Sequence, residues 1–260
     1  MEELRFIIDN LDIYLLVFAR IAGILLLNPI ISRNNIPARV RLGLTLCISV
    51  LITPSIQVPT DYQPETVGFL LDFMKEAAVG FLLGYVFNVF FYMLMTAGDF
   101  MDTNFGLAMA KVFDPATNIQ SAFSSNLLNV LFILYFFATN SHLTLMSAAT
   151  SSFDIVPVSA AHFALDKAAY FAVELFGDVF SLAMKLAIPF IAAEFVMEIS
   201  MGILMKLIPQ IHVFVIQYQL KIMLALILLY VLSGAIAAFV DNYTIMLFDN
   251  VKEALYALNS

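Results

Sequence analysis

The sequence is poor in charge. Only 12% of its 260 residues are charged, 62% are hydrophobic and the mean hydropathy is +0.94, whereas about a quarter of a soluble domain is charged. The 12 basic residues stand against 20 acidic ones, and the resulting net charge of -8 excludes a basic surface for nucleic acid and a polybasic lipid anchor. The composition predicts an integral membrane protein whose partners are membrane or membrane-associated proteins.

Residues that build reactive or metal-binding sites are also scarce. Cys47 is the single cysteine, so the sequence has neither an internal disulfide nor a Cys-based metal site. The three histidines stand far apart and outside HExxH spacing, and GxSxG, Walker A and GxGxxG motifs are absent. We therefore expect no enzyme activity, no metal and no cofactor, and any energy for transport must come from elsewhere.

The first residues lack the basic region of a cleavable signal. Residues 1–12 hold four acids and one arginine, Arg5, and no small-x-small cleavage site follows the first apolar run. We expect the first helix to be retained.

Six apolar segments fill most of the chain and predict an all-α fold of membrane-associated helices or helical hairpins. They are residues 11–31, 40–57, 67–97, 122–149, 168–207 and 211–240. Because proline ends or bends helices, Pro189 and Pro209 are expected to divide one stretch into helices 168–188 and 190–208.

Ionisable residues within these segments need partners, since each would cost about 2.5 to 3.5 kcal/mol at a bilayer centre. Asp72 can pair with Lys75 on one helical face, which Glu76 shares. Glu174 with Asp178 and Glu194 with Glu198 are like-charge pairs at i, i+4 spacing. Each pair requires a cation from another helix or subunit, or water. We interpret the following as inter-subunit or wet-rim charges: Glu174, Asp178, Glu194, Glu198, Lys206 and Lys221. A proton relay is the alternative, disfavoured because the titratable groups form no alternating series.

One long polar interruption, residues 98–120 (GDFMDTNFGLAMAKVFDPATNIQ), is not explained by an ordinary turn. It is too polar to span a bilayer and too apolar for a solvent loop. Bare backbone cannot sit in hydrocarbon, so other protein or a water-filled cavity must satisfy it. It is the first candidate for a pore, a gate or a substrate site.

Three stretches together resemble one family, the FliR-type flagellar export-gate proteins and their virulence-secretion relatives. They are residues 98–120, residues 139–158 (TNSHLTLMSAATSSFDIVPV) and residues 188–222, which contain Pro-Gln-x-His-Val-Phe. The family's usual glycine is replaced by Ser141 and its usual asparagine by His212. Residues 217–219 also depart from the family, which commonly has Gly or Pro there.

The resemblance implies a subunit of the flagellar basal body in the bacterial inner membrane. Proteins of this kind join FliP and FliQ in a helical assembly through which unfolded flagellar proteins pass, and FlhA and FlhB are further partners. One such chain closes a ring of several copies of the others. Residues 1–162 would be a FliP-like part and residues 163–260 a FliQ-like hairpin, within a single integrated unit.

We expect residues 98–120 to project into that channel and help to seal it. Three apolar side chains would form a deformable plug: Phe105, Met109 and Phe113. Gly106 would allow the backbone to turn, and Asp114 with Pro115 would orient the next helix.

Three alternatives remain open. The segment could be re-entrant and serve packing alone. In an ion-coupled secondary transporter it would be a broken helix, with Asp99, Asp102, Glu194 and Glu198 coupling ions. In an intramembrane aspartyl protease two of Asp99, Asp102 and Asp114 would converge on one water, but no flanking motif supports this.

Overall fold

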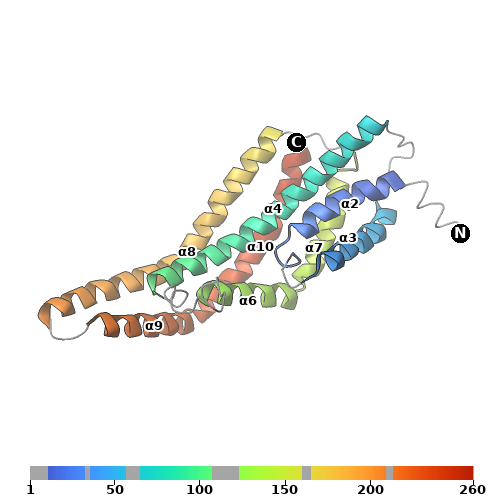
Figure 1. The fold of residues 1–260 in the computed structure, drawn as a ribbon. Coiled ribbons are helices and arrows are strands. Elements are labelled where there is room, and N and C mark those ends of the chain that lie inside the picture. The colour runs from blue at the N-terminus through green and yellow to red at the C-terminus, as the bar shows by residue number, and fades with distance from the viewer. Residues whose placement is uncertain are drawn as a thin grey trace. The chain divides into compact units, whose positions relative to one another are not determined.

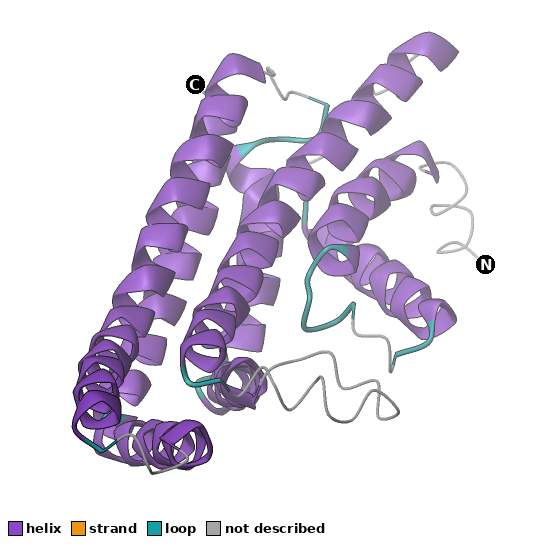
Figure 2. Ribbon diagram, turned by 60° about the vertical axis from the view of Figure 1, so that its left-hand side comes forward, coloured by secondary structure: helices purple, strands orange, loops and turns teal. Residues whose placement is uncertain are grey.

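The fold is helical wherever the structure, a computed structural model, describes the chain. The described residues are 11–32, 36–56, 65–106, 123–159, 165–208 and 213–259. Within these ranges Figure 2 shows helices joined by short loops and no strand. The predicted all-α fold is confirmed.

Eight α-helices and one short 3-10 helix follow one another in the described residues (Figure 1). They are α2 (Leu11–Leu26), α3 (Ala38–Ile52), η1 (Thr53–Ser55), α4 (Thr66–Asn104), α6 (Phe123–Ala138), α7 (Ser141–Ile155), α8 (Leu165–Leu207), α9 (Val213–Val231) and α10 (Ser233–Asn259).

Several helices are long and apolar enough to cross a membrane. Within the described residues they are Ala38–Ser55, Thr66–Asn104 and Asp166–Leu207. Two further pairs, α6 with α7 and α9 with α10, are each bent at a short break and pass the same test when taken together. The chain therefore has the helices of a membrane protein.

Prolines lie next to several helix ends, whereas Pro189 lies inside a helix. Helix α2 ends before Pro29, Pro37 directly precedes α3, and α7 ends before Pro157. Helix α8, in contrast, continues through Pro189 from Leu165 to Leu207. The predicted division at this proline is wrong, because proline removes only one backbone hydrogen bond and a long membrane helix can continue through that loss.

The chain forms two compact units, each assembled from separate stretches of sequence. Unit 1 comprises Met1–Phe90, Phe137–Phe176 and Ile245–Ser260, and unit 2 comprises Phe91–Phe136 and Gly177–Thr244. The predicted parts 1–162 and 163–260 express likeness to partner proteins and remain a prediction, separate from this division by packing.

In unit 1, helices α2 and α4 cross at unusually short range. A Cβ atom at Gly80 would lie 2.2 Å from the backbone oxygen of Arg20, and one at Gly23 would lie 2.4 Å from the carbonyl carbon of Gly80. One turn further along α4, a Cβ atom at Gly84 would lie 2.5 Å from the backbone oxygen of Gly23. Glycines four residues apart let two membrane helices approach backbone to backbone.

The close crossing brings together a fully buried ion pair. The Nε atom of Arg20 donates to Oε2 of Glu76 at 2.6 Å, and both side chains have zero exposed surface. The other carboxylate oxygen of Glu76 accepts from the backbone N–H of Ser159 at 3.0 Å. Nearby, Lys75 pairs with Asp72 at 3.1 Å, as their spacing predicts. Glu76 pairs instead with Arg20, which is 56 positions away in the sequence.

Arg20 also binds the end of α7. Its Nη1 atom donates to the carbonyl oxygens of Ser152 and Val156, each at 2.8 Å, and its guanidinium lies 4.1 Å from the ring centre of Phe153. The carbonyl of Ser152 also accepts from the backbone N–H of Val156 at 3.0 Å, so Arg20 is a second donor there, at the C-terminal end of α7, where the helix dipole favours a cation. One arginine thus joins α2, α4 and α7.

Unit 2 has an aromatic core. The ring of Phe132 on α6 meets Phe91 of α4 edge-on at 6.4 Å and Tyr243 of α10 at 6.3 Å. Tyr243 also stacks on Phe239 at 5.3 Å. Such ring pairs add to the burial of apolar area, and they join α4, α6 and α10 within unit 2.

Candidate functional site

The polar segment 98–120 begins as helix. Helix α4 continues to Asn104, so Asp99 and Asp102 lie in its last turns. Phe105 and Gly106 follow, and Gly106 has a φ of +71°. A residue in this left-handed conformation commonly ends a helix, and glycine adopts it without a Cβ clash. Gly106 therefore makes the turn that the sequence predicts there.

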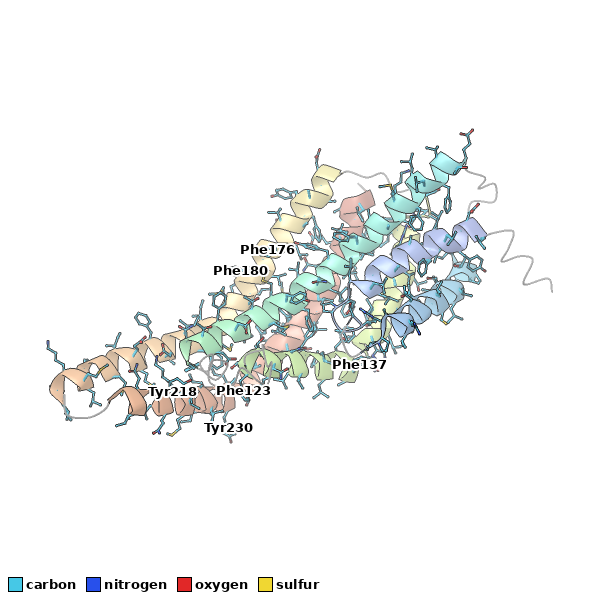
Figure 3. The ribbon with its side chains drawn as sticks, viewed as in Figure 1. Phe123, Phe137, Phe176, Phe180, Tyr218 and Tyr230 are labelled. Atoms are coloured by element: carbon cyan, nitrogen blue, oxygen red, sulfur yellow. The ribbon has the colours of Figure 1, made fainter. Side chains whose placement is uncertain are left out.

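Two aromatic contacts hold the start of the loop within unit 2. The ring of Phe105 is 1% exposed and meets Phe190 of α8 edge-on at 6.4 Å. The hydroxyl of Tyr218, which Figure 3 shows on α9, donates to the carbonyl oxygen of Gly106. A Cβ atom at Gly106 would lie 3.1 Å from the Tyr218 ring, so a larger residue would crowd this contact. The loop therefore starts from an anchored point.

Asp102 connects this end of α4 to the start of α6. Its side chain is fully buried, and Oδ2 accepts from the backbone N–H of Ser124 at 2.7 Å. The first N–H groups of a helix have no partner within it and attract negative charge, so the Asp102 carboxylate caps α6. One turn earlier, a Cβ atom at Gly98 would lie 2.3 Å from Cα of Ser125.

These contacts place the two ends of the connection 107–122 beside each other. Helix α4 ends at Asn104 and α6 begins at Phe123, and the Asp102 carboxylate near the first end binds the N–H of Ser124 at the second. The predicted residues Met109, Phe113, Asp114 and Pro115 fall in this connection and lie outside the described residues.

Asp102 and Phe105 are both buried, and each makes different contacts. Asp102 is buried near the end of α4 and caps α6, whereas Asp99, three residues earlier on the same helix, is exposed. Phe105 is packed inside the chain against Phe190. A sealing role for its ring would require the loop to leave this position, and the plug at Phe105 remains a prediction.

The like-charge pair Glu194 and Glu198 on α8 lies beside a cation of the same chain. Glu194 is 2% exposed and forms an ion pair with Lys221 of α9. The same ammonium lies 3.6 Å from Glu198, whose side chain is 55% exposed. The spacing predicts the need for a cation from another helix, and Lys221 meets it.

The other predicted rim charges lie on exposed parts of α8. Glu174, Asp178 and Lys206 are all exposed in the chain by itself. Their proposed contacts with other subunits remain a prediction. Among the described residues no group of three His, Cys, Asp or Glu side chains is placed to hold a metal ion.

Replacing Asp102 tests its capping role. We expect Asp102→Leu to lower the free energy of unfolding by about 1 to 3 kcal/mol, because the Ser124 N–H would be buried without an acceptor. Asp102→Asn should cost much less, since an amide oxygen still accepts and Oδ1 has no partner among the described residues. Thermal unfolding of the purified protein in detergent measures both, and equal losses would contradict the assignment.

Removing the Lys221 ammonium tests the buried pair on α8. We expect Lys221→Met to cost about 3 to 5 kcal/mol, because Glu194 would remain buried without a cation. The double variant Lys221→Met, Glu194→Met should recover most of this loss. Unfolding of the three proteins provides the comparison, and an equal loss in single and double variants would show that the charges do not act as a pair.

Sequence reasoning did not single out Phe190 or Ser124. Phe190 follows a proline that seemed to end a helix, and Ser124 is one of several small polar residues. Tyr218 fell within residues 217–219, which stood out only because they depart from the resembled family. The strong apolar runs of α8 and α9 predict that some side chain of these helices packs against the loop start, but they do not specify which one.

Comparisons with known proteins match the chain over most of its length. The model of the family described as bacterial export proteins, family 1, matches residues 11–246. The flagellar biosynthetic protein FliR of Bacillus subtilis (strain 168) is 30% identical over 96% of each chain. FliR of Escherichia coli (strain K12) is 27% identical over 95% of this chain and 94% of its own. The Yop proteins translocation protein T of Yersinia pestis is 24% identical over 92% of each.

Proposed function

We propose, since this chain belongs to family 1 of the bacterial export proteins, that it is a channel subunit of a flagellar type III protein export gate in the bacterial inner membrane. It would join FliP-like and FliQ-like subunits, with FlhA-like and FlhB-like proteins as further partners. Its cargo would be unfolded flagellar proteins. The match across residues 11–246 is the observation that carries the proposal.

The exposed surface of the chain supports a protein that works among other subunits. In α8 and α9, large apolar side chains are exposed on several sides, among them Val196 at 65%, Leu207 at 72% and Tyr230 at 84%. Lipid can cover such side chains, but it does not satisfy the exposed charges of α8, such as Asp178 and Lys206. Neighbouring helices with complementary groups would cover both.

The loop 107–122 is the part that would seal the channel. Its anchored ends support this role, because a plug must return to the same place after each passage. Met109 and Phe113 are its apolar candidates, and apolar side chains close a narrow pore by excluding water. Phe105 and Gly106 would hold one end of the loop against Phe190 and Tyr218 in the closed state.

The alternative of an ion-coupled transporter is less well supported. It requires Glu194 and Glu198 to bind and release ions, but Lys221 already lies against both carboxylates. The relatives are named as flagellar biosynthetic and translocation proteins, not as transporters of small solutes or as enzymes. We therefore favour the export gate.

Co-purification tests the proposed function. The tagged chain, extracted from native membranes in a mild detergent, should bring FliP-like and FliQ-like subunits with it in fixed proportion. A tagged membrane protein of similar size and unrelated function is the control. A chain that purifies alone and drives solute uptake in liposomes would instead support the transporter.

A further inference from the structure

Helix α3 buries polar side chains and exposes apolar ones, the reverse of a helix on a water-covered protein. Thr45 is fully buried and Ser49 is 2% exposed. Each hydroxyl donates to the carbonyl oxygen four residues earlier, Thr45 to Arg41 at 2.8 Å and Ser49 to Thr45 at 2.7 Å. Because both hydroxyls are satisfied within the helix, the polar side of α3 can face the rest of the chain without water.

The exposed side of α3 is apolar throughout the stretch from Leu42 to Ile52. Thr45 and Ser49 are the only polar residues of this stretch, and both are buried. We name its exposed residues the outer α3 face, and they are Leu42, Leu44, Leu46, Cys47, Val50 and Leu51. A free cysteine behaves as a small apolar residue, so this face offers nothing that water or a polar partner would bind.

A positive charge stands at one end of this face. Arg39 is exposed in the first turn of α3, which holds no acidic residue, and it forms no ion pair within the part of the chain that the structure describes. The helix dipole disfavours a cation at this end. Arg41 lies on another side of the helix, since residues two apart do not face each other, and it donates to Oγ of Ser32 at 2.7 Å. Arg39 is therefore free to bind an anion from outside the chain.

Length and side-chain type favour lipid over another subunit as the cover of the outer α3 face. The 18 residues Ala38–Ser55 are apolar enough to cross a membrane. At 1.5 Å per residue they extend about 27 Å, close to the thickness of the hydrocarbon core. Contacts between membrane helices are enriched in small and polar residues, whereas this face consists mainly of leucine and valine. Such a face fits acyl chains.

We propose that the outer α3 face lies against the acyl chains of an anionic phospholipid and that Arg39 binds the phosphate of its headgroup. A guanidinium is always charged, and its N–H groups match the oxygens of a phosphate. Its apolar stem can extend to the level of the headgroups while α3 stays in the hydrocarbon. The inference goes beyond the proposed function, because it holds whether or not the chain works in an export gate.

Quenching by brominated lipids tests the proposal. A fluorescent amino acid encoded in place of Cys47, which is exposed, would report on the outer α3 face without labelling any other subunit. The full-length chain, with the subunits that co-purify with it, would be placed in phosphatidylcholine nanodiscs. We expect brominated phosphatidylglycerol to reach half-maximal quenching at a mole fraction about fivefold lower than brominated phosphatidylcholine, the preference that one arginine near an anionic surface gives.

Three variants separate the headgroup contact from general effects of charge. Arg39→Gln should bring the two lipids to within about twofold of each other, and Arg39→Lys should keep most of the preference. Lys185→Gln removes one exposed cation from α8 instead, and it should keep the full preference. Since Arg39 is exposed, Arg39→Gln should unfold in detergent at the wild-type temperature.

Three results would overturn the inference. Absence of quenching by either lipid would mean that a subunit covers the outer α3 face. Equal quenching by both lipids in the wild-type chain would mean that Arg39 selects no anionic headgroup. Loss of the preference in excess inorganic phosphate would identify free phosphate, and not a lipid, as the anion that Arg39 binds.

Discussion

Membranes that hold the assembled complex should conduct ions when Phe105 to Met109 are deleted from this chain, with conductance rising on the order of tenfold or more. The deletion removes part of the apolar loop and also its anchored start, since Phe105 packs on Phe190 and Gly106 accepts from Tyr218. We expect both losses to open the channel. Conductance of the purified complex in planar bilayers, together with small-molecule permeability in cells, measures the effect.

A second variant separates the plug from its anchor. Met109→Ser with Phe113→Ser keeps the loop length and the contacts of Phe105 and Gly106, and removes only apolar side chains. We expect it to conduct as the deletion does, because a polar constriction stays wet. Tyr218→Phe, which removes one hydrogen bond to the loop start, should conduct less than either. Unchanged conductance of the deletion, in complex that is fully assembled, would refute the plug.

The second large effect is expected at the crossing of α2 and α4. Gly80→Ala places a methyl group where the backbone oxygen of Arg20 lies 2.2 Å away, so the two helices must separate. Separation strains the buried Arg20–Glu76 pair, and breaking such a pair costs about 3 to 5 kcal/mol. We expect Gly80→Ala to lower stability by several kcal/mol, on the order of that cost, and to reduce the amount of protein in the membrane.

The same substitution at Gly43 is the matched control. This glycine lies in α3, and a Cβ atom there would meet nothing within 4 Å. Gly43→Ala should stabilise the purified chain slightly, by up to about 1 kcal/mol, because alanine favours the helix. Thermal unfolding in detergent compares the two. Similar changes in both variants would mean that the crossing is looser than the structure shows.

Hydropathy predicts the helices of this chain well, but it does not predict how they meet. Apolar runs are a property of local sequence, so the all-α membrane fold follows from them directly. Local spacing likewise predicts the pairing of Asp72 with Lys75. Pro189 shows the limit, since the sequence around a proline does not distinguish a helix that ends there from one that continues, as α8 does.

The sequence predicts that some charged residues need a distant partner, but it does not predict which residue that partner is. Glu194 and Glu198 require a cation, but nothing near them in sequence indicates Lys221. Glu76 seemed to belong with its neighbours on α4, and its true partner is Arg20. The spacing of Gly80 and Gly84 was the available signal, because glycines four residues apart mark a close helix crossing. The sequence alone marks residues 98–120 as a candidate pore, gate or substrate site, and the plug within it stays a prediction.

Cross-linking to a trapped cargo tests most directly whether this chain lines an export channel. A photo-crosslinker at position 109 would be activated in cells whose export is stalled by a flagellar protein fused to a tightly folded domain. We predict a cross-link between the loop and the unfolded part of the stalled protein, lost when the cargo lacks its export signal. Cross-links to neighbouring subunits or lipid alone, with stalled cargo present in the complex, would contradict this prediction.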